Sequence, residues 1–261
     1  MTQDAVLYAV DAGVARVTLN RPNRRNAIDL ATMKLLDDRI EQAASDTSVG
    51  CIVLDGTGDS FCAGGDLGAG MDEIVGAADE MLAAASRTVS GLVHAPQPVI
   101  TAVDGPAVGV GASLALASDL VIATTRAHFI LPFAGMGLIP DGGATATLAA
   151  SVGRARAMRI LLLRERVTAE EALAAGLVSV VCDPEDLEVT ITKCSSDLAA
   201  APWTALSRTK AFVNEYALAG LDRTLEREAE EQADRLASPE FREAIEAFTG
   251  RRVGAAGTDS A

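Results

Sequence analysis

Two glycine-rich segments, each of which follows an apolar run, constrain the fold of this chain more than any other feature. The first spans residues 61–67 (Phe-Cys-Ala-Gly-Gly-Asp-Leu) and the second spans residues 104–111 (Asp-Gly-Pro-Ala-Val-Gly-Val-Gly). The runs before them, 51–54 and 98–103, are typical of buried strands, and a helical run follows the second at 112–117. Backbone N–H groups at such strand-to-helix turns lack partners and favour negative charge. Two of these N–H groups directed at one point would form an oxyanion hole.

Strand and helix patterns alternate through most of the chain. Residues 6–19 predict a hairpin, residues 30–44 an amphipathic helix, and residues 120–123 a further strand. This order favours an α/β fold with largely parallel pairing. Further on, Thr168 and Glu171 form a capping box, Gly176 ends that short helix, and residues 178–181 predict a last strand.

From residue 184 onward the sequence predicts helices alone. We therefore expect a catalytic α/β core at residues 1–195. A helical region at 196–253 would cover part of that core or contact another subunit. The small, polar tail at 254–261 is expected to be disordered.

Composition narrows the function classes. The formal net charge of −14 argues against general binding of nucleic acid or of an anionic membrane. Arg21, Arg24 and Arg25 form a local basic cluster that fits either a small polyanion or a solvated loop. No apolar run is long enough to span a bilayer, and no secretory signal is visible. The four scattered cysteines indicate neither a zinc site nor a disulfide framework, so we expect a reducing cytoplasm.

Short motifs in the order and spacing of a known family run through nearly the whole chain. Besides the two glycine-rich segments they are Asn20-Arg21-Pro22, Asn26-Ala27, Ser118-Asp119, Gly137-Leu138-Ile139-Pro140-Asp141-Gly142-Gly143, Gly153-Arg154-Ala155-Arg156-Ala157, and Thr168-Ala169-Glu170-Glu171-Ala172 with Gly176-Leu177-Val178. With them the chain resembles the crotonase superfamily, the enoyl-CoA hydratase/isomerase group. The resemblance implies a spiral of ββα repeats with a C-terminal helical region, homotrimers or hexamers, and acyl-CoA thioester substrates of the kind met in fatty acid metabolism. It implies no metal and no separate cofactor, since coenzyme A is part of the substrate.

The resemblance also assigns roles to residues. The backbone N–H groups of Gly65 and Val110 correspond to the two oxyanion donors, and valine keeps the donor because it is a main-chain group. The coenzyme A-binding loops correspond to the stretch that contains Arg24 and Arg25 and to the stretch that contains Ala63, Asp66 and Leu67.

This chain departs from the pattern of a typical hydratase at both catalytic glutamates. Ser113 and Phe133 stand at those two positions and are expected to line the acyl substrate instead. One carboxyl remains at a suitable place, Asp141, and its apolar neighbours would raise its pKa and make it a better base. An alternative from the residues alone is that Asp141 caps a helix that begins near Gly142.

We therefore expect an enzyme that moves a double bond from the Δ3 to the Δ2 position of an enoyl-CoA by a single-carboxylate proton shuttle. Alternatives within the family are an enoyl-CoA hydratase, another CoA-thioester lyase or a dehalogenase, and an inactive acyl-CoA-binding protein. A dinucleotide-binding oxidoreductase is a weaker alternative. Leu114 replaces the third glycine of its motif, and the expected acidic residue is missing further along the chain.

Overall fold

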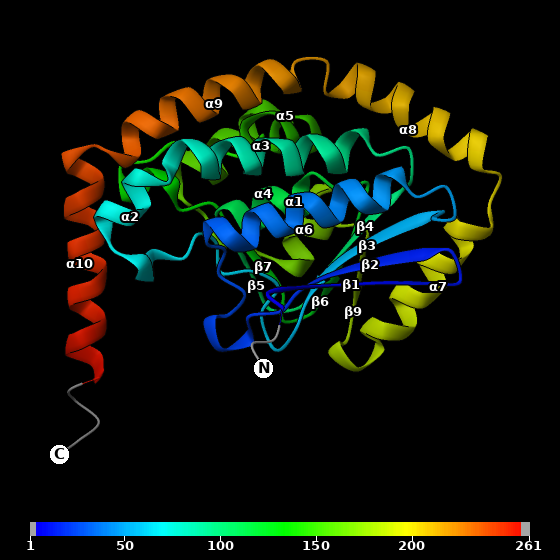
Figure 1. Cartoon of the computed structure of the whole chain (residues 1–261), viewed down its shortest axis with the longest axis horizontal. Coiled ribbons are helices and arrows are strands. Elements are labelled where there is room, and N and C mark those ends of the chain that lie inside the picture. The colour runs from blue at the N-terminus through cyan, green and yellow to red at the C-terminus, as the bar shows by residue number, and fades with distance from the viewer. Residues whose placement is uncertain (1–3, 257–261) are drawn as a thin grey trace.

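The computed structural model describes residues 4–256, except the side chains of residue 69 and residues 248–256 (Figure 1). A six-stranded sheet forms the centre. Its strands in spatial order are β1 (Val6–Asp11), β2 (Val14–Leu19), β3 (Cys51–Gly56), β4 (Val99–Val103), β6 (Leu120–Thr124) and β9 (Val180–Cys182). The first pair is antiparallel and the rest are parallel, as the alternating strand and helix patterns predict.

A smaller sheet lies beyond the ends of these strands. It consists of β5 (Pro106–Val108), β7 (His128–Ile130) and β8 (Val167–Thr168). The chain passes from β4 into β5 through Gly105, whose φ is +69° and where a Cβ would lie 2.1 Å from the Asp59 carbonyl oxygen. Only glycine fits such a turn. No pattern in the sequence predicts this second sheet.

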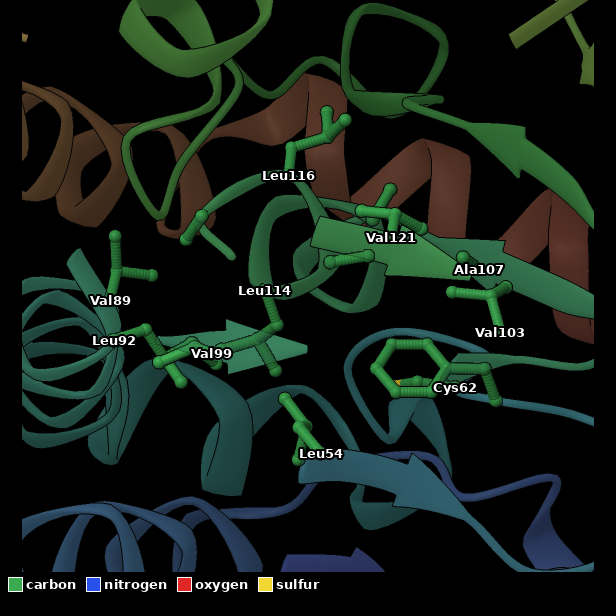
Figure 2. Close-up of a cluster of buried hydrophobic side chains, with 14 of the residues drawn as sticks. Leu54, Cys62, Val89, Leu92, Val99, Val103, Ala107, Leu114, Leu116 and Val121 are labelled. Atoms are coloured by element: carbon green, nitrogen blue, oxygen red, sulfur yellow. The ribbon is translucent and has the colours of Figure 1, made fainter. Parts of the chain in front are cut away.

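Helices cover both faces of the larger sheet. On one face lie α1 (Leu30–Ser45), α3 (Ala78–His94) and α4 (Val110–Leu116), whose buried apolar side chains join those of the strands in the main core. Figure 2 shows Val89 and Leu92 of α3 on one side of this core and Val103 and Ala107 on the other, with Leu114 between them. On the opposite face, α7 (Leu187–Ala200) packs on the sheet through a separate cluster that includes Ile191.

The helical region begins later than expected. Helix α7 runs without a break through the expected boundary at 195/196, and because it packs on the sheet it belongs to the core. The helices α8 (Trp203–Ala217), α9 (Leu221–Leu236) and α10 (Pro239–Ala256) then arc around the edge of the molecule (Figure 1). Residues 254–256 of the expected tail are the end of α10, and residues 257–261 lie outside the described part.

Contacts anchor this arc to the core. The ammonium group of Lys210 in α8 forms an ion pair of 2.8 Å with Asp119 and donates to the carbonyl oxygens of Leu92 and Gln97. Helix α9 packs on α3 and on α5 (Ala144–Leu163). The remaining elements are α2 (Met71–Gly76), α6 (Ala169–Ala175) and the 3-10 turns η1 (Pro22–Arg24), η2 (Leu67–Ala69), η3 (Phe133–Met136) and η4 (Pro184–Asp186). Within residues 4–256, none of the helices has the length and apolar character that crossing a bilayer demands.

Candidate active site

The two glycine-rich turns lie side by side. The N–H of Cys62 donates to the carbonyl oxygen of Pro106 at 3.1 Å, and the N–H of Val108 donates to that of Cys62 at 2.9 Å. Gly64 has a φ of +91°, and a Cβ there would lie 2.9 Å from the Val108 oxygen. A side chain at Gly64 would therefore separate the two turns. At the second turn, a Cβ on Gly111 would lie 2.6 Å from the Cβ of Cys62, so this glycine also allows the close approach.

The apposed turns present two free main-chain donors. Val110 is the first residue of α4, and Gly109 before it is the N-cap, with φ +54°. Gly65 lies one residue beyond Gly64 and is exposed. In the described part of the chain, the N–H groups of Gly65 and Val110 donate to no protein acceptor. Both are therefore available to a ligand oxygen.

The two segments expected to hold coenzyme A are also neighbours. The N–H of Ala63 donates to the Arg25 oxygen at 3.0 Å, and the N–H of Ile28 donates to the Gly64 oxygen at 2.8 Å. Arg24 and Arg25 are exposed, whereas Leu67 is partly buried. The basic side chains therefore border the first glycine turn.

Asp66 and Arg21 have internal partners instead. Arg21 forms ion pairs with Asp66 at 3.0 Å and with Asp29 at 2.9 Å. The other Asp66 carboxylate oxygen accepts the N–H of Gly68 at 3.1 Å, which caps η2. These contacts hold the first turn in shape. Of the three arginines in the basic cluster, Arg24 and Arg25 are the exposed ones.

Ser113 and Phe133 lie against the second turn. The buried Ser113 hydroxyl donates to the main-chain oxygen of Asp141 at 2.8 Å, which connects the 137–143 loop to α4. Phe133 begins η3, and a Cβ on Gly109 would lie 3.8 Å from its ring. Neither side chain has a carboxylate for proton transfer, and the contact of Ser113 brings the main chain of Asp141 to α4.

The Asp141 carboxyl is buried and only half satisfied. Its Oδ2 accepts a hydrogen bond from Nε2 of Gln232 at 3.0 Å, whereas its Oδ1 is buried without a partner. The pKa of Asp141 is raised to about 7, mainly by burial. The hydrogen bond from Gln232 opposes this rise, and the charge of Glu228 adds to it. A carboxyl that titrates near neutrality can both take up and return a proton.

The capping alternative for Asp141 is wrong. The N-cap of α5 is Gly143, and the carboxylate of Glu228 in α9 accepts hydrogen bonds from N–H groups at this end of α5. The Glu228 carboxylate accepts from the N–H of Gly143 at 2.7 Å, and from the N–H and the hydroxyl of Thr145 at 3.1 and 2.5 Å. The Asp141 side chain is thus left free of that structural task.

Sequence reasoning missed Glu228 and Gln232. Both are buried although they are polar, and they lie one turn apart on α9 in line with Leu221 and Leu225. Polar residues at the positions of a helix that otherwise carry its buried leucines are the signal that could have identified them.

Cys62 belongs to the first turn and faces Gly111 of the second, but it is not a candidate nucleophile. Its side chain is fully buried, and burial raises the pKa of its thiol to about 12. The sulfur accepts the N–H of Gly64 at 3.4 Å. A neutral, enclosed thiol of this kind contributes packing rather than reactivity.

The protein has an α/β fold in which two glycine-rich turns meet, and the loop that carries the buried carboxyl of Asp141 is hydrogen-bonded to the helix that follows the second turn. A family model described as enoyl-CoA hydratase/isomerase matches residues 9–254. The chain belongs to this family, a branch of the crotonase superfamily, and the resemblance predicted from the motifs is confirmed.

Individual relatives cover almost the whole chain. The chain is 37% identical to the 1,2-epoxyphenylacetyl-CoA isomerase of Escherichia coli, over 95% of this chain and 96% of that protein. It is 34% identical to a probable enoyl-CoA hydratase of Rhodobacter capsulatus, with 97% of each covered. The crystal structure of an enoyl-CoA hydratase from Mycobacterium avium subsp. paratuberculosis superposes with a TM-score of 0.87 at 38% identity, covering 94% of this chain and 99% of that one. The spiral fold with C-terminal helices is therefore confirmed, and the names include both isomerases and hydratases.

Proposed function

We propose that this protein moves the double bond of an enoyl-CoA thioester from the Δ3 to the Δ2 position. The observation that carries the proposal is the buried, unpartnered Oδ1 of Asp141. The main chain of the same residue accepts the hydroxyl of Ser113, on the helix that begins at Val110. Ser113 and Phe133 stand where a two-glutamate hydratase would carry its carboxylates. One carboxyl is enough for this reaction because no water is added.

The proposed reaction returns its proton to the substrate. The thioester oxygen accepts hydrogen bonds from the N–H groups of Gly65 and Val110. Asp141 removes a proton from C2, and the electron pair moves onto the thioester oxygen to form an enolate. The protonated Asp141 then delivers the same proton to C4, and the double bond re-forms between C2 and C3. Each oxyanion donor of this kind contributes about 3–4 kcal/mol to lowering the barrier.

The pKa of Asp141 fits both halves of this cycle. At about 7 it lies near neutral pH, where the ionised and protonated forms coexist. Burial supplies most of this shift. The exposed Arg24 and Arg25 beside the first turn are the proposed contacts for the phosphates of coenzyme A, and Leu67 the proposed apolar one.

Relatives widen the range of substrates to be tested. The name of the Escherichia coli relative specifies an epoxide of phenylacetyl-CoA, and that of the Rhodobacter relative an enoyl-CoA hydration. The assay therefore compares 3-enoyl-CoA, 2-enoyl-CoA and 1,2-epoxyphenylacetyl-CoA side by side. Faster turnover of the 3-enoyl thioester supports the proposal, and faster hydration of the 2-enoyl thioester overturns it.

Replacing the carboxyl tests the proposed role of Asp141. Asp141→Asn keeps an acceptor for Gln232 but cannot take up a proton, so kcat is expected to fall by roughly 10²–10⁴-fold while the binding of the CoA ester changes little. Asp234→Asn is the matched control because it removes one charge from an exposed position on α9. An Asp141→Asn protein that retains most of the isomerase activity would refute the assignment.

We also propose that the chain assembles as trimers or hexamers in the cytoplasm. Exposed Phe212, Val213 and Tyr216 on α8 support an assembly, because soluble monomers rarely gather such side chains at the surface. The four free cysteines support a reducing compartment. A monomer mass in light scattering would contradict the first of these proposals.

A further inference from the structure

Gln232 has a fixed orientation next to the proposed base. Its side chain is 1% exposed and lies between the main chain of Ile139 and the carboxyl of Asp141. A main-chain N–H can only donate, so the atom 3.0 Å from the Ile139 nitrogen is the amide oxygen. The amide nitrogen therefore faces Oδ2 of Asp141 at 3.0 Å. The N–H of Ile139 therefore determines that the NH₂ end of the Gln232 amide faces the carboxyl of Asp141.

This orientation makes the two oxygens of Asp141 unequal. One lone pair of Oδ2 accepts the N–H of Gln232, and a proton at that position would face a donor, so it is held as an acceptor. Oδ1 is buried and has no protein partner. We propose that Gln232 is a positioning residue that holds Oδ2 of Asp141 as a permanent acceptor and leaves Oδ1 to take and return the substrate proton. This inference rests on the proposed isomerase function.

Further contacts keep the Asp141 carboxyl in place. Gln232 holds the loop at Ile139 as well as at the Asp141 side chain, and Ser113 of α4 donates to the Asp141 main-chain oxygen. The residue is thus held from two helices. A base restrained in this way serves C2 and C4 with the same oxygen, without turning its second oxygen toward the substrate.

The charges around Asp141 are few among the described residues. Glu228 lies one turn before Gln232 on α9, and its charge raises the pKa of Asp141. Its own carboxylate is occupied by donors from Gly143 and Thr145. Ser113 of α4 and the Val89 side chain of α3, which face the same loop, carry no charge. Gln232 is therefore the donor that favours the ionised form of the carboxyl.

Two substitutions separate the tasks of Gln232. Gln232→Glu preserves size and an acceptor for Ile139 but replaces the donor facing Asp141 with a second carboxyl oxygen. Gln232→Met preserves approximate length and removes both hydrogen bonds. Arg223→Gln is the matched control for Gln232→Glu, because it makes the same change in net charge at an exposed position on α9.

The first readout is the pH dependence of isomerisation. Loss of the donor raises the pKa of Asp141, so the acid limb of kcat/KM should move to higher pH, by about one unit or more in Gln232→Glu and by less in Gln232→Met. The kcat of Gln232→Glu at neutral pH should fall about fivefold or more and recover as the pH rises, with KM nearly unchanged. Arg223→Gln should follow the parent. A limb that stays in place in both Gln232 variants overturns the inference.

The second readout does not need turnover. The infrared carbonyl band of protonated Asp141 is identified by its absence in Asp141→Asn, and its intensity is followed against pH. The midpoint should rise in both Gln232 variants, and an unmoved midpoint overturns the inference. If the midpoint rises but the parent isomerises no 3-enoyl thioester, the proposed function has failed and the hydrogen-bond effect of Gln232 stands.

Discussion

Substituting Asp141 should stabilise the fold, and the gain should depend on pH. Burial raises the pKa of this carboxyl to about 7 in the folded chain, against about 3.9 in an unfolded chain. Below both values each state is protonated and no difference arises. Between them the folded state retains a proton that the unfolded state has released, so stability falls as the pH rises. Above both, the full penalty of about 4 kcal/mol applies.

Asp141→Asn removes this penalty, because asparagine has the shape of the protonated acid and does not ionise. From about pH 5.5 to about pH 8 its advantage over the parent in the free energy of unfolding should widen by roughly 2 kcal/mol. Urea denaturation at each pH measures the difference, and Asp234→Asn controls for net charge. An advantage that stays constant over this range would mean that Asp141 ionises like an exposed acid. Asp141 would then not be a buried base.

Three further substitutions test the packing and the charges around the site. Gly64→Ala places a methyl carbon 2.9 Å from a carbonyl oxygen of the second turn, at a residue whose φ is +91°. The free energy of unfolding should fall by about 1–3 kcal/mol, and kcat should fall as well. If neither changes, the two turns do not approach as closely as described. Lys210→Met removes the ion-pair partner of Asp119, which lies 2.8 Å away. The free energy of unfolding, measured by urea denaturation, should fall by about 3–5 kcal/mol, and adding Asp119→Asn should restore most of it. A double variant no more stable than Lys210→Met would contradict this. Glu228→Gln removes the charge that raises the pKa of Asp141, so the acid limb of kcat/KM should move to lower pH. If the limb moves to higher pH instead, the main effect of Glu228 is its capping of α5 and not its charge.

The sequence predicts the larger sheet well because its signals are local. Residues 6–19 form the expected hairpin with Val6 opposite Leu19, and the expected helix at 30–44 is α1. The capping box of Thr168 and Glu171 is present with both of its hydrogen bonds. Each of these depends on neighbouring residues or on a period that the sequence displays directly.

The smaller sheet escapes prediction for the opposite reason. Its strands have two or three residues, too few for an alternating pattern, and their pairing depends on the stacking of successive units. The end of the core at 195/196 also fell inside α7, because a helix that packs on a sheet has the same pattern as one that leaves it.

The candidate site divides along the same line. The two glycine turns and the Asp141 loop are contiguous motifs, so sequence alone selects them. Gln232 lies 91 residues from Asp141, and only the tertiary fold brings them together. Gln232 is a polar side chain on the buried face of α9, and the sequence alone does not show which face of this helix is buried.

Two residues of α9 shift the pKa of Asp141, although α9 carries none of the proposed reacting groups. Glu228 and Gln232 act on Asp141 in opposite directions from adjacent turns of one helix. Exchanging that helix between relatives would therefore retune proton transfer while the main-chain donors stay in place. The arc that wraps the core is thus a second place, apart from the loops, where divergence within the family can alter chemistry.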